Sequence, residues 1–266
     1  MLLVRQPMRT RGTLRHALGA ALVAASVAGT ACAREAGDPI RLRWEEGDVS
    51  GFTSIYSADG KHVIGFVEYS QSRRGNLLSM VRISRFKDGS SDEDRADAYV
   101  GPTLRAVGGR SIVRDTDGRA LVDLVIDVAN GRIAGCTDID GDRKAYDEHV
   151  DLPPATYWGP LLFVVLKNFN GNAEDGRIVF RTVVPTPKPR VLDMEIVRED
   201  AARLPRPGGS VDAVRFGLRP TFNRFVDPLV HLFVPDATFF VAPSRPPSLA
   251  GFTGPRNYAG QEIRLE

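Results

Sequence analysis

Apolar and polar residues alternate along many short segments of this chain, and this alternation is the strongest constraint on its fold. Apolar side chains occupy every second position in five segments, at residues 40–44, 122–128, 192–196, 214–218 and 263–265. Successive side chains of an extended strand point to opposite faces, so each segment would have one apolar and one polar face. This pattern is typical of antiparallel sheets with one face on a core.

Turn dipeptides separate many of these segments. Asn-Gly or Asp-Gly occurs seven times, at 59–60, 88–89, 117–118, 130–131, 140–141, 170–171 and 175–176. Type I′ turns need positive φ at both central residues, which Asn, Asp and Gly tolerate best. The clearest predicted hairpins join 111–115 to 120–128, and 122–128 to 132–137. The sequence therefore predicts a meander of neighbouring antiparallel strands.

One segment reads as a buried helix. Pro160 can occupy a first helical position, residues 161–169 are almost all apolar, and Asn170-Gly171 is a plausible stop. A helix that is apolar on all sides is expected to pack against a sheet. A second, short helix is expected at 199–204, before the Pro/Gly-rich segment 205–209.

The predicted fold is mainly β, an antiparallel meander curled into a barrel or half-barrel with one buried apolar helix. Unpaired strand edges favour aggregation, so a long meander has to close, cover or charge its edges. The alternating segments 40–44 and 261–266 stand at opposite ends of the predicted domain. Pairing between them would close the sheet.

The first 33 residues predict a signal peptide. Arg5, Arg9, Arg11 and Arg15 precede an apolar run at 17–27, and Ala31-Cys32-Ala33 matches the pattern of a cleavage site. The apolar run is shorter than the roughly 20 residues that a membrane-spanning helix needs, so a retained anchor is the weaker alternative. Lipidation of Cys32 is less favoured, because Gly29 is unusual three positions before a lipidated cysteine.

Residues 34–266 are then expected to form a single β-barrel-like domain, periplasmic or secreted. The four leader arginines account for the positive charge of the whole chain, and their loss changes the formal charge from +2 to −2. Nucleic-acid binding requires clustered Lys and Arg, so we expect no nucleic-acid partner. After cleavage Cys136 is the remaining cysteine, which excludes an internal disulfide.

The sequence nominates no catalytic or metal site. The hydrolase pattern G-x-S-x-G is absent, and His62, His149 and His231 lack a recognisable catalytic or zinc-binding context. The acidic segment 138–142 has the wrong glycine and glutamate spacing for a calcium loop, so we interpret it as a solvated turn. The acidic run 88–97 is interpreted as an exposed loop. No cofactor is expected.

Four aromatic residues cluster at the predicted helix: Tyr157, Trp158, Phe163 and Phe169. Such residues usually belong to the core. However, an apolar ligand often binds in the mouth of a β-barrel. These four residues are therefore the candidate ligand contacts.

From about residue 140 onward, the order of features resembles one bacterial family. Val-Asp-Leu-Pro-Pro at 150–154 precedes the helix, and Asp175-Gly176 precedes a strand at 177–184. A strand with Asp193 and Glu195 follows, then Ala-Thr-Phe-Phe-Val at 237–241, a proline-rich step and Tyr-Ala-Gly-Gln-Glu-Ile-Arg-Leu at 258–265. This order resembles exported proteins catalogued as a domain of unknown function, with a lipocalin-like or lipoprotein-carrier-like curled β-sheet. The resemblance covers about the last half of the chain and implies a fold and a compartment, without catalytic residues.

Three functions remain open. The first is a non-enzymatic periplasmic binding or carrier protein for an apolar small molecule or lipid, held between the sheet and the helix. The second is a cell-envelope scaffold or interaction module with a filled interior. The third is a hydrolase with dispersed catalytic residues, which requires one histidine near a serine and an aspartate.

Overall fold

The computed structural model describes residues 39–139, 141–169, 176–184, 188–206, 208–221, 237–256 and 261–265. The predicted signal peptide lies outside these ranges and stays a prediction. Within them the chain forms a 14-stranded sheet and one helix. The elements are β1 (Val49–Ser57), β2 (Val63–Arg74), β3 (Leu77–Phe86), β4 (Ser91–Val100), β5 (Leu104–Arg114), β6 (Ala120–Asp127), β7 (Arg132–Ile139), β8 (Asp142–His149), α1 (Leu161–Asn168), β9 (Arg177–Val184), β10 (Arg190–Arg206), β11 (Gly209–Pro220), β12 (Ala237–Ala242), β13 (Ser248–Pro255) and β14 (Glu262–Leu265).

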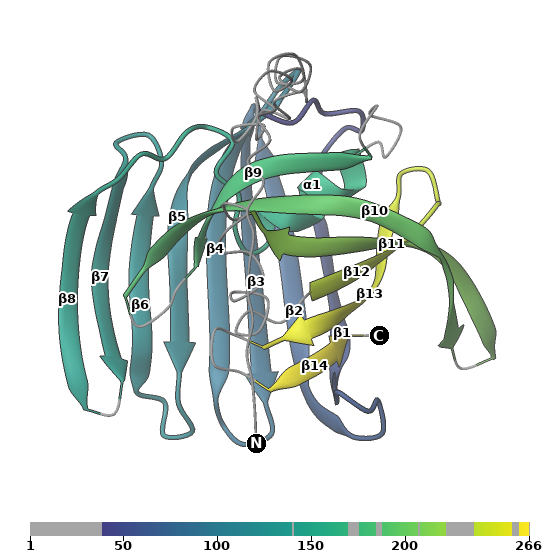
Figure 1. Ribbon diagram of the computed structural model, residues 1–266, viewed down its shortest axis with the longest axis horizontal. Coiled ribbons are helices and arrows are strands. Elements are labelled where there is room, and N and C mark those ends of the chain that lie inside the picture. The colour runs from purple at the N-terminus through teal and green to yellow at the C-terminus, as the bar shows by residue number, and fades with distance from the viewer. Residues whose placement is uncertain are drawn as a thin grey trace, which may run out of the picture. The chain divides into compact units, whose positions relative to one another are not determined.

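The sheet is a continuous antiparallel meander that curls without closing. Its strand order is β8-β7-β6-β5-β4-β3-β2-β1-β14-β13-β12-β11-β10-β9, so the edges are β8 and β9 (Figure 1). Strands β9–β11 cross in front of β2–β4, with α1 behind them (Figure 1). The predicted fold, mainly β and curled around one apolar helix, is confirmed.

The predicted closure of the sheet is wrong. The last strand does pair with the first, through Ile55 and Leu265, but this pair lies in the middle of the sheet. Residues 40–44 form no strand: Arg41 makes an isolated bridge to Thr103, and the Ile40 carbonyl accepts a hydrogen bond from the Leu104 amide. This segment therefore caps the start of β5. The edge strand β8 is instead protected by charge, because five of its eight residues are charged and exposed.

The two clearest predicted hairpins are confirmed. Strands β5 and β6 pair with Val113 opposite Val122, and β6 and β7 pair with Ile126 opposite Ile133. Their turns hold Gly118 and Gly131 at positive φ, of 80° and 62°. These backbone angles favour glycine, which has no Cβ to clash.

The helix predicted after Pro160 is present as α1, whereas the one predicted at 199–204 is wrong. Residues 199–204 belong to β10, where Ala202 pairs with Ala213 and Leu204 with Val211 of β11. A helix of only six residues has little stability by itself. In the strand, by contrast, alternate residues form backbone hydrogen bonds with β11. The predicted exposed loop at 88–97 is also wrong, because it enters strand β4 at Ser91.

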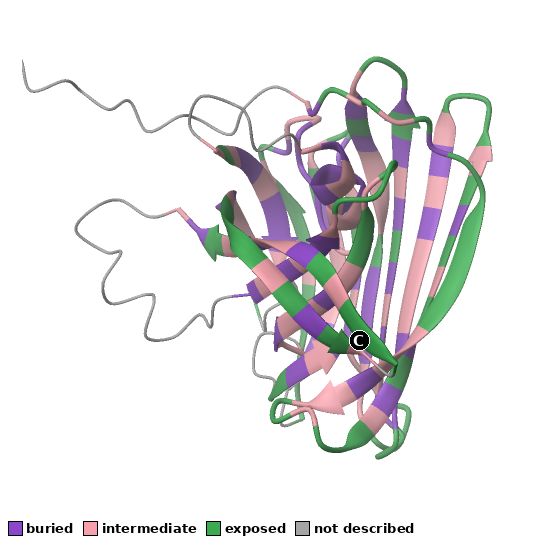
Figure 2. Ribbon diagram, turned by 90° about the vertical axis from the view of Figure 1, so that its right-hand side faces the viewer, coloured by how far each residue is buried: buried purple, intermediate pink, exposed green. Residues whose placement is uncertain are grey.

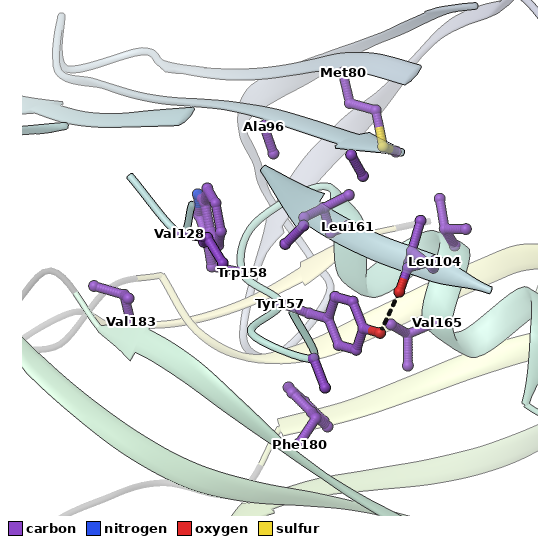
Figure 3. Close-up of a cluster of buried hydrophobic side chains, with 14 of the residues drawn as sticks. Met80, Ala96, Leu104, Val128, Tyr157, Trp158, Leu161, Val165, Phe180 and Val183 are labelled. Carbon is purple, nitrogen blue, oxygen red and sulfur yellow. Dashed lines mark hydrogen bonds between the residues drawn. The ribbon is translucent and has the colours of Figure 1, made fainter. Parts of the chain in front are cut away.

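The main hydrophobic core lies between the two halves of the sheet. It joins buried residues of β3–β7, α1 and β9–β12 in one cluster. Buried and exposed residues alternate along these strands (Figure 2), as the sequence pattern predicts. Tyr157 links the segment before α1 to β5, because its hydroxyl donates a hydrogen bond to the Leu104 carbonyl at 2.8 Å (Figure 3).

A network of polar groups fixes the C-terminal end of α1. Glu46 is buried and accepts from Lys167 Nζ at 2.8 Å and from Asn168 Nδ2 at 3.2 Å. The Asn168 side-chain oxygen in turn accepts from the Arg43 amide at 2.8 Å. The segment before β1 thereby holds the helix in place. Within the described ranges, no helix is both long and apolar enough to cross a membrane.

Candidate functional site

A cavity of about 370 Å³ lies between α1 and the inner face of the curled sheet. One wall comes from β3, β4 and β5, and the facing wall comes from β9–β13. Trp158, Gly159, Leu162 and Phe163 contribute the side formed by α1 and the turn before it. The volume falls within the roughly 300–1,000 Å³ of ordinary small-molecule sites.

The wall from β9–β13 is almost wholly apolar, and we call it the apolar wall. Its residues lining the cavity are Val183, Val184, Leu192, Met194, Leu218, Pro220, Ala237, Phe239, Phe252 and Pro255. Phe239 and Phe252 pack with ring centroids 5.0 Å apart. This wall offers contact to an apolar group and no charged side chain.

The opposite wall carries polar residues in register across three strands, and we call it the polar wall. Arg82 of β3 stands opposite Asp94 of β4, and Asp94 stands opposite Ser111 of β5. Two positions further along, Ser84 stands opposite Asp92 and shares that face. Because directly paired residues share a face, all five side chains line the same cavity.

Each acid of the polar wall is paired with an arginine. Arg82 NH2 donates to Asp94 Oδ2, and the Ser111 hydroxyl donates to Asp94 Oδ1 at 2.7 Å. Arg256, which follows β13, donates through Nε to Asp92 Oδ2 at 3.3 Å. Its guanidinium also lies 3.4 Å from the centre of the Phe86 ring, within the range of a cation–π contact.

Asp92 is only 6% exposed, and this burial raises its pKa above the ordinary value. Removing a carboxylate from water disfavours its charged form, and Arg256 only partly offsets that cost. The cavity lining has four charged residues, two arginines and two aspartates, so neither sign of charge is in excess.

Two donors on this cavity have no hydrogen-bond partner among the described residues. They are Nε1 of Trp158 and Nε of Arg82, both buried atoms of residues that line the cavity. Trp158 is 3% exposed, so its indole N–H is also shielded from bulk water. Buried polar groups normally have partners, and an unmatched one calls for an explanation.

Gly159 allows the turn before α1 to approach the polar wall. Its φ is +49°, and a Cβ built there would lie 2.9 Å from the Asp94 Cβ. A larger residue would have to displace Asp94, so the missing side chain brings Trp158 and Asp94 to one cavity.

A second cavity, of about 390 Å³, adjoins the first. Val67, Phe163 and Leu265 line both, so Phe163 stands between them. The second cavity is also lined by Phe52 and Leu249, whose side chains are exposed. It therefore extends the apolar surface from the interior towards the outside of β1.

The structure separates the four predicted contact residues. Trp158 and Phe163 line the main cavity, whereas Tyr157 and Phe169 are absent from its lining. Tyr157 is fully buried beside Phe180, and burial raises the pKa of its hydroxyl to about 12. Phe169 packs edge-on against Phe216, with ring centroids 5.7 Å apart. The ligand role of all four stays a prediction.

Sequence reasoning missed the polar wall. Asp92 and Asp94 were assigned to an exposed loop, but they alternate in step with Ala96, Ala98 and Val100, which are buried. Continuing that period backwards would have placed both aspartates on the inner face.

The histidines and the acidic turn add nothing to the site. His62 and His149 are exposed and do not line the main cavity, and His231 lies outside the described residues. Asp138 and Asp142 belong to the β7–β8 hairpin, where Asp138 pairs with Arg119. In the described part of the chain, no three His, Cys, Asp or Glu residues gather as a metal site would require.

Comparison with solved structures finds likenesses of fold. The chain is similar to the crystal structure of a β-barrel-like protein of domain of unknown function DUF1849 from Brucella abortus, with a TM-score of 0.45 and 11% identity, over 83% of this chain and 95% of that chain. No family model matches the sequence. No curated protein matches it significantly. The chemistry of the site is therefore inferred from its own residues.

Proposed function

We propose that this protein is a non-enzymatic binding or carrier protein for an apolar or lipid-like small molecule, held in the cavity beside Trp158. The observation that carries the proposal is the cavity itself, which remains open beside α1 although the rest of the helix packs against the sheet. Cavities lined mainly by apolar side chains with a few polar groups are the usual form of ligand sites.

The lining supports a carrier better than the scaffold alternative. A scaffold would have a filled interior, since a packed core maximises stability. Here ten residues of the apolar wall surround open space, at a cost in stability that a bound apolar molecule would recover. The hydrolase alternative has no support from His62 or His149, because both are exposed at turns or strand ends.

The compartment belongs to the same proposal. A leader with four arginines and an apolar run supports export, and the chain would then act in the periplasm or outside the cell. The resemblance to exported lipocalin-like or lipoprotein-carrier-like proteins agrees with a carrier role for an apolar molecule.

The test is ligand binding by protein freed of lipid. We expect an uncharged fluorescent naphthalene probe to brighten on binding, and native mass spectrometry to show one bound acyl ligand. Leu192→Trp should weaken both signals, because the larger ring takes up part of the cavity that Leu192 lines.

Leu77→Trp is the matched control. Leu77 is also half-buried in a strand, but it lines neither of the two cavities beside α1. This variant should bind as the unaltered protein does. Absence of any probe signal and any bound ligand in the unaltered protein would refute the carrier proposal.

A further inference from the structure

The two unpartnered donors belong to two residues that line the same cavity. Trp158 Nε1 and Arg82 Nε both carry N–H groups, and neither has a described acceptor. Both residues line the cavity, one from the turn before α1 and the other from β3. An N–H group without a partner in a buried site loses its bond to water and gains nothing in exchange.

The two carboxylates of the cavity lining already accept hydrogen bonds from other donors. Asp94 accepts from Arg82 NH2 through one oxygen and from Ser111 through the other. Asp92 accepts from Arg256. We therefore look to the ligand for the acceptor of both N–H groups, and a carbonyl oxygen is such an atom.

The charge of the lining argues against an anionic acceptor. Arg82 and Arg256 are balanced by Asp94 and Asp92, so the site has no surplus positive charge. A ligand carboxylate would be desolvated beside two buried carboxylates, at a cost that the paired arginines cannot repay. An uncharged acceptor avoids that repulsion.

We propose that the ligand is an acyl ester or amide, whose uncharged carbonyl oxygen accepts hydrogen bonds from Trp158 Nε1 and Arg82 Nε while its chain lies on the apolar wall. This inference rests on the proposed carrier function and adds the chemical class of the ligand. The polar wall then orients the molecule, head against β3–β5 and chain against β9–β13.

The experiment measures displacement of the naphthalene probe by three ligands of equal chain length: decane, decanoate and decanoyl glycerol. Decanoyl glycerol should displace the probe at concentrations at least about tenfold lower than either of the others. One hydrogen bond is worth about this factor in affinity. The order should hold at neutral pH, where decanoate is ionised.

Two substitutions remove one donor each with little other change. Trp158→Phe keeps an aromatic ring without the N–H, and Arg82→Lys keeps the positive charge facing Asp94 without the Nε. Each should weaken decanoyl glycerol by about tenfold and leave decane unchanged. Circular dichroism and thermal unfolding would show that both variants remain folded.

The matched controls are Trp44→Phe and Arg85→Lys. Trp44 precedes β1 and is not among the cavity residues, and Arg85 lies on β3 but pairs with Glu68 on the exposed face. Both variants should bind all three ligands as the unaltered protein does.

The outcomes separate this inference from the carrier proposal. Equal displacement by decane and decanoyl glycerol, or equal losses for both ligands in the two donor variants, would overturn the ester or amide head group while leaving a carrier of apolar molecules. Stronger displacement by decanoate would overturn the uncharged head. If the probe and all three ligands fail to bind, the carrier function falls first.

Discussion

The two walls of the cavity come from the same sheet but have opposite chemistry. The inner face of β3–β5 carries three polar residues in register, Arg82, Asp94 and Ser111. Asp94 forms an ion pair with Arg82 and a hydrogen bond with Ser111. On β10–β13, the facing positions hold Met194, Leu218 and Phe239 instead. A hydrophobic core would not require the polar wall, and a site for a polar ligand would not require the apolar wall. A cavity with both walls suits a molecule that has one polar end and one apolar end.

The largest expected effect lies on the polar wall. Asp94→Ala removes the partner of Arg82 and Ser111 and should lower the free energy of unfolding by about 3 kcal/mol, since breaking a buried pair strands its other member. Denaturant unfolding measures this loss.

The double variant Arg82→Met/Asp94→Leu is the control for that prediction. It removes both charges together and should be more stable than Asp94→Ala, because no unpaired charge remains. If the double variant loses as much free energy of unfolding as Arg82→Met and Asp94→Leu lose in sum, the two side chains are not coupled.

A smaller effect is expected on the apolar wall. Met194→Ala should cost about 2 kcal/mol, because Met194 is only 9% exposed and its removal widens the cavity. Its unfolding free energy should show the same salt dependence as that of the unaltered protein. The variant should also accept longer or branched chains, as measured by probe displacement. Unchanged ligand preference would argue that Met194 does not touch the chain.

The smallest effect is a pH dependence of the polar wall. Burial raises the pKa of Asp92, so the folded protein holds that proton more tightly than the unfolded chain does. Stability from Asp92 is therefore present at acidic pH and is lost as pH rises through the raised pKa. Relative to the unaltered protein, Asp92→Asn should gain stability as pH rises from about 4 towards neutrality. A stability difference that stays constant with pH would contradict the burial of a charged Asp92.

Local patterns were sufficient to predict the sheet and the helix. The alternation of apolar residues and the Asx-Gly turns depend on residues that are close in the sequence. The start of α1 at Pro160 and the hairpins around Gly118 and Gly131 depend on such local residues too. The segment 199–204 shows the limit of such reasoning: its strand state depends on its pairing with β11.

The polar wall could not be predicted because its partners are distant in the chain. Arg256 is 164 residues from Asp92, and only the curl of the sheet brings them together. Without that partner, an acidic run such as Asp92–Asp94 reads as solvent-exposed. The same holds for the closure of the sheet, because the segment 40–44 binds beside β5 rather than β14.

Quenching of tryptophan fluorescence by a brominated acyl glycerol tests the central claim most directly. The chain has two tryptophans, so Trp44→Phe leaves Trp158 as the single reporter beside the cavity. Bromine quenches at short range, and we expect saturable quenching of Trp158 in Trp44→Phe. We expect none of Trp44 in Trp158→Phe, at a ligand concentration high enough to saturate the weakened site of that variant. Equal quenching in both variants, or none in either, would contradict a ligand held between α1 and the curled sheet.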